Sequence, residues 1–183
     1  MHPSQVAALQ GTSQLPEFRA LFEAEFSYVA RTLRFLGVRR PDIEDVAHEV
    51  FMGVFRQLHA FDNARPLRPW LFGFAYRIAR DFRALARHKY EADCEPVEAP
   101  DPAPPCDELL GRSEALALAF RALDTLDEDE RAVFVAHELD EHPMPAVAEA
   151  LGIALNTAYS RLRRARANFE AAAEQVARRE KLR

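Results

Sequence analysis

One stretch near the C-terminus, residues 156–166, carries side chains suited to contacting DNA. Arginine guanidinium groups pair with guanine or phosphate, and amide and hydroxyl groups add hydrogen bonds to base edges. Few acids lie near these arginines in the sequence, so we expect them to meet a polyanion rather than salt-bridge partners. The alternative is the solvated face of a terminal bundle helix. The candidate contacts are Asn156, Thr157, Tyr159, Ser160, Arg161, Arg163, Arg164 and Arg166.

The residues around this stretch predict a helix-turn-helix. A short helix from about residue 146 precedes Gly152, which suits a left-handed turn, and a second helix begins at Leu155 or Asn156. The small side chain of Ala148 lets the two helices cross closely. The expected core residues are Val147, Leu151, Ile153 and Leu162. In this arrangement the first residues of the second helix can reach base edges in a major groove.

A second cluster, in residues 51–90, interleaves basic and aromatic side chains. Nine of the 18 aromatic residues lie there, and residues 65–89 hold seven basic side chains against the single acid Asp81. Bases stack on aromatic rings while arginines follow the phosphates, so this composition favours single-stranded nucleic acid. Most of the rings are expected in the core, namely Phe51, Phe55, Phe74 and Phe82. Trp70, Tyr76 and the 61–63 loop are the better candidates for contact.

A third feature is an acidic helix face without catalytic partners. Asp45 and Glu49 lie one helical turn apart, a spacing that costs some stability and favours a face kept for a partner. His48-Glu49 begins a zinc-protease motif, but Met52 stands where the second histidine ligand belongs. No glycine-rich phosphate loop and no Gly-x-Ser-x-Gly is present, and Cys94 and Cys106 form no Cys-x-x-Cys pair. We therefore expect no enzymatic activity, metal, cofactor or small-molecule substrate.

The hydrophobic spacing predicts an all-α protein of two small helical domains. Apolar stripes mark a helix that ends at Gly37 and another that follows Asp42 as its N-cap. Asp127 and Glu130 form a capping-box pattern at a later helix. Between the domains, five prolines and six acids in residues 91–107 predict an extended linker. The predicted boundaries are residues 15–90, a linker over 91–108, and a helix-turn-helix domain over 109–178.

Charge is segregated along the 183 residues, although the net charge is only −5. Residues 1–90 carry +4, residues 91–110 carry −7, residues 111–155 carry −7 and residues 156–183 carry +5. This asymmetry indicates polyanion contact at the two basic stretches. The apolar runs are far shorter than the roughly 18 residues of a membrane span, and no secretory signal is recognisable. We therefore expect a soluble, cytoplasmic protein.

Three segments together resemble the sigma-70 family, in its extracytoplasmic-function (ECF) subgroup. The first, Asp42-Ile-Glu-Asp45-Val-Ala-His-Glu49-Val-Phe51, looks like the helix that binds core polymerase. The stretch from Phe61 to Asp81, with Arg65-Pro66 and Trp70-Leu71, resembles the promoter-melting region. The segments Leu126-Asp-Glu-Asp-Glu-Arg131 and Thr157-Ala-Tyr-Ser160-Arg161-Leu-Arg-Arg164-Ala-Arg166 are similar to the domain that reads the −35 element.

The resemblance implies a role for each cluster and a set of partners. The 156–166 residues named above would read the −35 duplex. The −10 element would meet Phe61, Asp62, Asn63, Arg65, Trp70, Tyr76, Arg77, Arg80, Arg83 and Arg87. The clamp helices of the polymerase's largest subunit would meet Asp45, His48, Glu49, Phe51, Met52 and Phe55. The implied partners are the RNA polymerase core enzyme, promoter DNA and an anti-sigma factor.

Two other classes of protein fit parts of the same sequence. The first is a helix-turn-helix transcriptional regulator in which residues 1–90 form a dimerisation or ligand domain. The second is a helical adaptor without a nucleic-acid role, for which charge reversal at Arg161 and Arg164 would change nothing.

Overall fold

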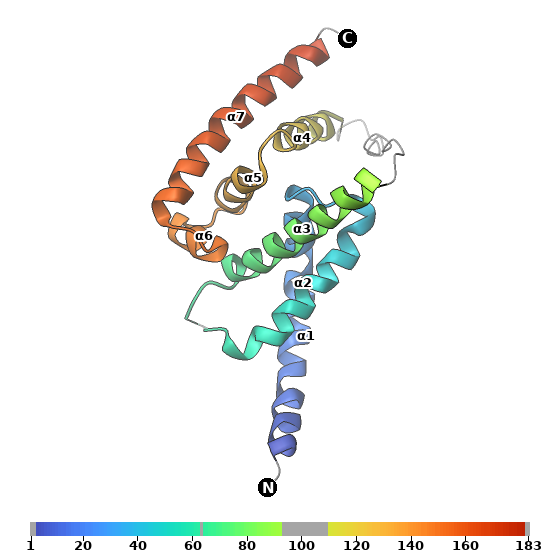
Figure 1. Ribbon diagram of the computed structural model, residues 1–183, viewed down its shortest axis with the longest axis vertical. Coiled ribbons are helices and arrows are strands. Elements are labelled where there is room, and N and C mark those ends of the chain that lie inside the picture. The colour runs from blue at the N-terminus through green and yellow to red at the C-terminus, as the bar shows by residue number, and fades with distance from the viewer. Residues whose placement is uncertain (1–2, 63, 93–109, 182–183) are drawn as a thin grey trace.

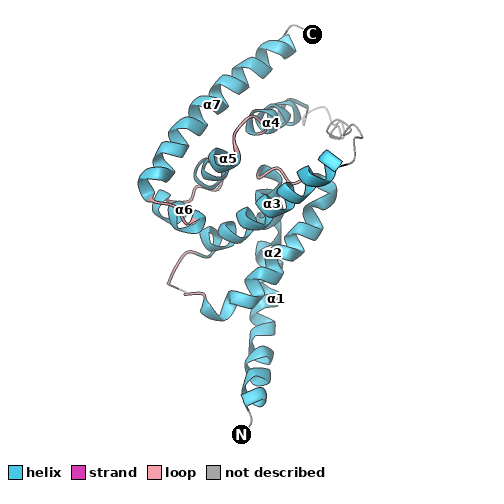
Figure 2. Ribbon diagram, in the orientation of Figure 1, coloured by secondary structure: helices cyan, strands magenta, loops and turns pink. Residues whose placement is uncertain are grey.

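The computed structural model describes residues 3–62, 64–92 and 110–181, and every regular element in them is helical (Figures 1 and 2). The all-α prediction is confirmed. The α-helices are α1 (Pro3–Phe35), α2 (Ile43–Gln57), α3 (Leu67–Ala92), α4 (Leu110–Leu123), α5 (Glu128–Phe134), α6 (Met144–Leu151) and α7 (Leu155–Lys181). Short 3-10 turns cover Arg40–Asp42 and Leu58–Ala60, and a π-helical turn covers Val135–Leu139.

Two glycines end helices where the sequence predicts it. Gly37 has a φ of +91°, and the amide of Val38 reaches back 3.0 Å to the carbonyl of Leu33, which closes the end of α1. Gly152 has a φ of +67° and forms the turn between α6 and α7. Both positions need a backbone conformation that side chains with a Cβ rarely adopt.

Both residues predicted as N-caps occupy that position, but only one of them makes the capping hydrogen bond. The carboxylate of Asp127 accepts a 2.7 Å hydrogen bond from the amide of Glu130 at the start of α5. Asp42 occupies the N-cap position of α2 but makes no capping hydrogen bond with its side chain. It accepts from Arg39 Nε at 3.0 Å instead, because a 3-10 turn leads straight into the helix. The predicted position of Asp42 is confirmed, but its side chain does not form the capping hydrogen bond.

This difference predicts unequal effects on stability. Asp127→Ala should lower the free energy of unfolding by about 1 kcal/mol, because an amide at the start of α5 loses its acceptor. Asp42→Ala should cost clearly less, since it removes only an exposed ion pair. Urea unfolding of the two variants and the wild type measures both values. Equal losses would contradict the assignment of the caps.

The helices form two groups that share one core. Helices α1–α3 pack together, as do α4–α7. Figure 1 shows α3 in the middle of the molecule, where it is the helix of the first group that faces α6 of the second. The buried side chains form one continuous cluster that includes Leu33, Val50 and Phe72 from the first group and Val133 and Leu162 from the second. Among the described residues, no helix is long and apolar enough to cross a membrane.

The most extensive contact between helices of the two groups is that of α3 with α6. Gly73 of α3 lies so close to α6 that a Cβ at this position would be 2.8 Å from the carbonyl oxygen of Ala150. The glycine therefore permits an approach that any other residue would block. Most of the predicted linker, from residue 93 onwards, lies outside the described residues, as do Cys94 and Cys106.

Candidate nucleic-acid interface

The predicted helix-turn-helix is formed by α6, the turn at Gly152 and α7. Val147 and Leu162 are buried between the helices, and Leu151 and Ile153 pack against the same core. On the opposite side of α7, Asn156, Tyr159 and Ser160 are exposed, and Tyr159 keeps 52% of its surface accessible. The predicted core and the predicted contact face therefore lie on opposite sides of the recognition helix, as DNA reading requires.

The arginines of this helix have acidic partners, which the sequence did not predict. Arg161 Nη2 lies 2.5 Å from Asp129 Oδ2, and Arg164 Nε lies 3.2 Å from Glu130 Oε1. Arg166 lies 2.5 Å from Glu138. These acids belong to α5 and the π-helical turn, and each precedes its arginine by about 30 residues in the chain. The expectation that few acids are near enough to neutralise these arginines is therefore wrong.

The predicted single-strand surface begins with a cluster of aromatic rings at the start of α3, tilted or edge-on to one another. The ring of Trp70 lies 4.6 Å from that of Phe61 and 4.9 Å from that of Phe74, and the Arg77 guanidinium lies 4.8 Å above Phe74. The side chain of Asp62 accepts from the amide of Ala64 at 2.9 Å, which fixes the loop before the helix. Asn63, also predicted here, lies outside the described residues.

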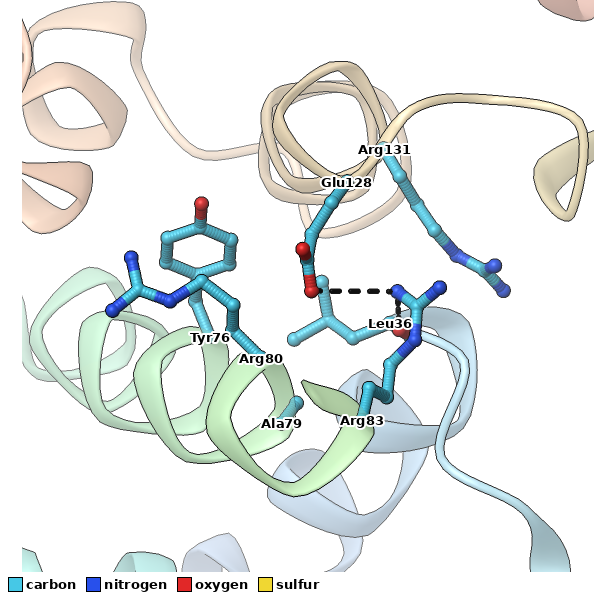
Figure 3. Close-up of a pocket in the computed structure, with 7 residues that line it drawn as sticks. All are labelled: Leu36, Tyr76, Ala79, Arg80, Arg83, Glu128 and Arg131. Atoms are coloured by element: carbon cyan, nitrogen blue, oxygen red, sulfur yellow. Dashed lines mark hydrogen bonds and ion pairs between the residues drawn. The ribbon is translucent and has the colours of Figure 1, made fainter. Parts of the chain in front are cut away.

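Three other predicted contacts, one just before α3 and two within it, are engaged by the second group of helices. Tyr76 is 7% exposed, and its hydroxyl donates to Asp129 Oδ1 at 2.8 Å. Burial, together with this hydrogen bond, raises the pKa of Tyr76 to about 12. Arg65 pairs with Glu149 of α6. Arg83 Nη1 lies 3.8 Å from Glu128 and donates to the Leu36 carbonyl at 3.1 Å (Figure 3).

The remaining basic residues of α3 differ in position. Arg80 is exposed and pairs with its neighbour Asp81 at 3.4 Å. Arg87 belongs to α3, but its side chain is not among those described. Of the predicted −10 residues, Tyr76 is therefore buried, whereas Arg65 stays exposed although it pairs with Glu149. Trp70 is half-buried, and Arg77 is exposed.

The predicted partner face of α2 is open. Asp45, His48, Glu49 and Met52 are all exposed, and Met52 keeps 54% of its surface accessible. Phe51 is 2% exposed and meets the ring of Phe22 at 4.7 Å, so it supports this face from the core and cannot itself touch a partner. Phe55 is half-buried beside Phe18.

Sequence reasoning missed a polar contact between α1 and the residues that precede α6. The hydroxyl of Tyr28 lies 2.8 Å from Nε2 of His142, and Thr32 donates to Asp140 at 3.0 Å. Arg31 also lies 3.5 Å from Asp140. More than 100 residues separate these partners in the chain, so no local spacing could indicate the contact.

The burial of His142 predicts a pH dependence of folding. Burial lowers the pKa of His142 below its ordinary value of 6.5. The unfolded chain therefore takes up this proton at a higher pH than the folded chain. The resulting stability is fully present above about pH 6.5 and is lost as the pH falls below it.

Thermal unfolding at pH 7.5 and pH 5.5 tests this expectation. The wild type should lose more stability over this interval than the His142→Gln variant does. His59→Gln, which removes an exposed histidine, is the matched control and should behave like the wild type. Identical pH dependence in all three proteins would show that His142 does not titrate in this way.

Comparison with known protein families assigns both halves of the chain. The model of sigma-70 region 2 matches residues 21–89, and that of sigma-70 region 4 matches residues 117–169. The chain belongs to the sigma-70 family. The sigma factor is of the ECF type, as its relatives show, and its region 2 contains α2 and most of α3, whereas its region 4 contains α5, α6 and the first half of α7.

Individual relatives agree with this assignment. The chain is 29% identical over 159 residues to the RNA polymerase sigma factor NccH of Alcaligenes xylosoxydans xylosoxydans, covering 84% of this chain and 85% of the relative. It is 26% identical over 134 residues to the ECF RNA polymerase sigma-E factor of Escherichia coli K12, covering 68% and 70% of the two chains.

Solved structures give the same picture. CnrH in complex with the cytosolic domain of CnrY matches with a TM-score of 0.62 and 26% identity, over 92% of this chain and 95% of that one. RpoE of Bartonella quintana, solved with the anti-sigma factor NepR, shares the fold, with a TM-score of 0.66 and 20% identity over 86% and 97% of the chains. The resemblance to ECF sigma factors is confirmed, and the regulator alternative is not favoured.

Proposed function

We propose that this sigma factor directs core RNA polymerase to specific promoters and helps to melt the −10 element. The observation that carries the proposal is the order of three surfaces within the two matched regions. An exposed acidic face on α2 and an aromatic, basic surface on α3 lie in region 2, and the recognition helix α7 begins in region 4.

The α2 face is the polymerase-binding surface in this proposal. Asp45 and Glu49 present two carboxylates, and Met52 adds an exposed apolar side chain between polar neighbours. A negative and partly apolar face is complementary to a basic helical partner, such as the clamp helices of the polymerase's largest subunit. The carboxylates would set orientation and the rate of encounter, while the apolar side chain adds burial.

The surface around Trp70 captures the non-template strand of the −10 element. The half-buried rings of Phe61 and Trp70 offer an aromatic surface for an unstacked base, and the exposed Arg77 nearby can meet a phosphate. The buried ring of Phe74 supports Trp70 from the core. Melting needs no hydrolysis. Each captured base offsets lost stacking by about 1–3 kcal/mol.

The recognition helix reads the −35 duplex. Asn156, Tyr159 and Ser160 lie at its exposed N-terminal end, where helix-turn-helix proteins contact base edges. Arg161, Arg163, Arg164 and Arg166 follow along the helix, so arginine can pair with guanine near the end and with phosphate further along. The polymerase supplies the chemistry of transcription.

The protein acts in the cytoplasm, where polymerase and promoters are found, and an anti-sigma factor is the expected inhibitory partner. The expectation of an anti-sigma factor rests on the fold shared with RpoE of Bartonella quintana, which was solved with the anti-sigma factor NepR.

Permanganate probing of reconstituted complexes tests the proposal. Core polymerase and the purified chain are mixed with a library of promoter fragments, and reactive thymines mark melted DNA. We expect reactivity about ten base pairs upstream of the start site only when both proteins are present. Strong, sequence-specific duplex binding by the chain alone, without melting, would support a transcriptional regulator instead.

A further inference from the structure

A buried acid lies against the recognition helix, where the proposed function calls for positive charge. Glu130 of α5 is 4% exposed, and both oxygens of its carboxylate are engaged by α7. Its Oε1 atom lies 3.2 Å from Nε of Arg164, and its Oε2 atom accepts from Nδ2 of Asn168 at 2.8 Å. A buried carboxylate needs such partners, because its charge is costly where water is excluded. Since Arg164 and Asn168 lie one helical turn apart, a single carboxylate holds two successive turns of α7.

The position of Glu130 is fixed by the helix that carries it. Its backbone amide donates to the carboxylate of Asp127 at 2.7 Å, at the start of α5. Later in the same helix Val133 and Phe134 are buried, and the ring of Phe134 lies 4.7 Å from that of Phe169 on α7. Figure 1 shows α5 beside α7, with which it packs. The carboxylate therefore projects from a rigid base next to the recognition helix.

Arg164 is held through one atom and left open at the others. A guanidinium has five N–H donors, one on Nε and two on each Nη. Glu130 engages Nε, and 61% of the Arg164 side chain is still exposed. The two Nη groups form the far end of the guanidinium, and parallel N–H donors of this kind match two oxygens of a phosphate. The contact with Glu130 thus fixes the guanidinium without using its phosphate-binding end.

The other paired arginines of α7 are bound differently. Arg166 has Nε at 2.8 Å and Nη2 at 2.5 Å from Glu138, so this acid occupies one edge of the guanidinium. Glu138 keeps 31% of its side chain exposed, and water therefore screens the pair. Arg161 is bound by Asp129 through Nη2, and only 20% of the arginine side chain is exposed. Among these three pairs, only that of Arg164 joins a buried acid to an open arginine through Nε alone.

We propose that Glu130 is a positioning residue for −35 recognition, which orients Arg164 so that its Nη groups meet a DNA phosphate. The proposal rests on the proposed function. Charge alone predicts the opposite role, because an acid beside a polyanion weakens binding and its removal strengthens it. If Glu130 instead orders the arginine before DNA arrives, its removal should weaken binding by about three- to ten-fold. The sign of the effect therefore separates the two roles.

Glu130→Gln tests the proposal with little change of shape. The single amide oxygen of glutamine can accept from Asn168, but its amide nitrogen then faces Arg164 and cannot hold it. Holoenzyme reconstituted with core polymerase is titrated against a promoter fragment on which the wild-type holoenzyme initiates, at several salt concentrations. We expect the Kd to rise about three- to ten-fold. The slope of log affinity against log salt should fall by about one, as for one lost phosphate contact.

The same substitution in an Arg164→Ala background separates positioning from folding. If Glu130 acts through Arg164, Glu130→Gln should no longer weaken binding once the arginine is absent. An equal loss in both backgrounds would show that Glu130 only supports the fold of region 4, and would overturn the proposal. Glu138→Gln is the charge-matched control, because it also removes one acid paired with an arginine of α7. This control should not weaken promoter binding.

The order of the Arg164 side chain can also be followed without DNA. NMR of the arginine Nε–H groups in the full chain, with the Arg164 signal assigned by its loss in Arg164→Ala, measures mobility and exchange with water. The signal should be ordered and protected in the wild type and mobile in Glu130→Gln. Equal mobility, or promoter binding by Glu130→Gln that is unchanged or tighter, would overturn the proposal. Failure of the proposed function would differ, because the wild-type holoenzyme would then form no promoter complex although the NMR contrast remained.

Discussion

Reversing the charge of Asp45 should abolish binding to core RNA polymerase and leave the helical fold intact. Asp45 is exposed on α2, and no buried group depends on it, so the substitution to arginine needs no rearrangement of the core. At a basic partner the new side chain sets like charges against each other, which costs several kcal/mol. We expect the affinity to fall by at least about 100-fold.

Co-purification with tagged core polymerase measures this loss, and circular dichroism checks the fold. Glu174→Arg is the matched control, because it reverses an exposed acid on α7, far from the α2 face along the chain. It should retain polymerase. Unchanged affinity in the Asp45→Arg variant would move the polymerase-binding surface away from α2.

Replacing Arg161 by alanine should weaken the discrimination between −35 sequences. A guanidinium that pairs with a base contributes about 1–3 kcal/mol of discrimination, which corresponds to about 5- to 150-fold. The substitution also removes a partner of Asp129, so the charge beside the helix changes at the same time. Discrimination, rather than overall affinity, is therefore the quantity that identifies base reading.

Transcription by reconstituted holoenzyme from promoters with single −35 substitutions measures the effect. Arg163→Ala, an exposed neighbour on the same helix, serves as the comparison. If Arg161 reads a base, its variant loses preference at one position of the element. A uniform loss across all sequences would assign Arg161 to a phosphate instead.

Local chemistry explains which parts of the fold could be predicted from the sequence. The turn at Gly152, the end of α1 at Gly37 and the cap at Asp127 each depend on residues within one or two helical turns. Asp42 shows the limit of such rules, because its side chain had an alternative partner in Arg39. Helical periodicity likewise placed Val147 and Leu162 in the core correctly.

The contacts between the two regions could not be predicted in this way. The pairing of Tyr76 with Asp129 and that of Tyr28 with His142 join residues 53 and 114 positions apart. In the sequence, Asp129 belongs to the acidic first turn of a helix. The packing of α5 between α3 and α7 places its carboxylate beside the hydroxyl of Tyr76 and the guanidinium of Arg161. The burial of Tyr76 could not be predicted from the sequence, because it depends on tertiary packing alone.

The measurement that tests the central claim most directly is initiation by reconstituted holoenzyme on a promoter library. Core polymerase is supplied with nucleotides, with or without this chain, and the start sites of the transcripts are sequenced. We expect the chain to create a defined set of starts that share one −35 and one −10 element. Initiation that is no more frequent and no more selective with the chain than without it would contradict the account.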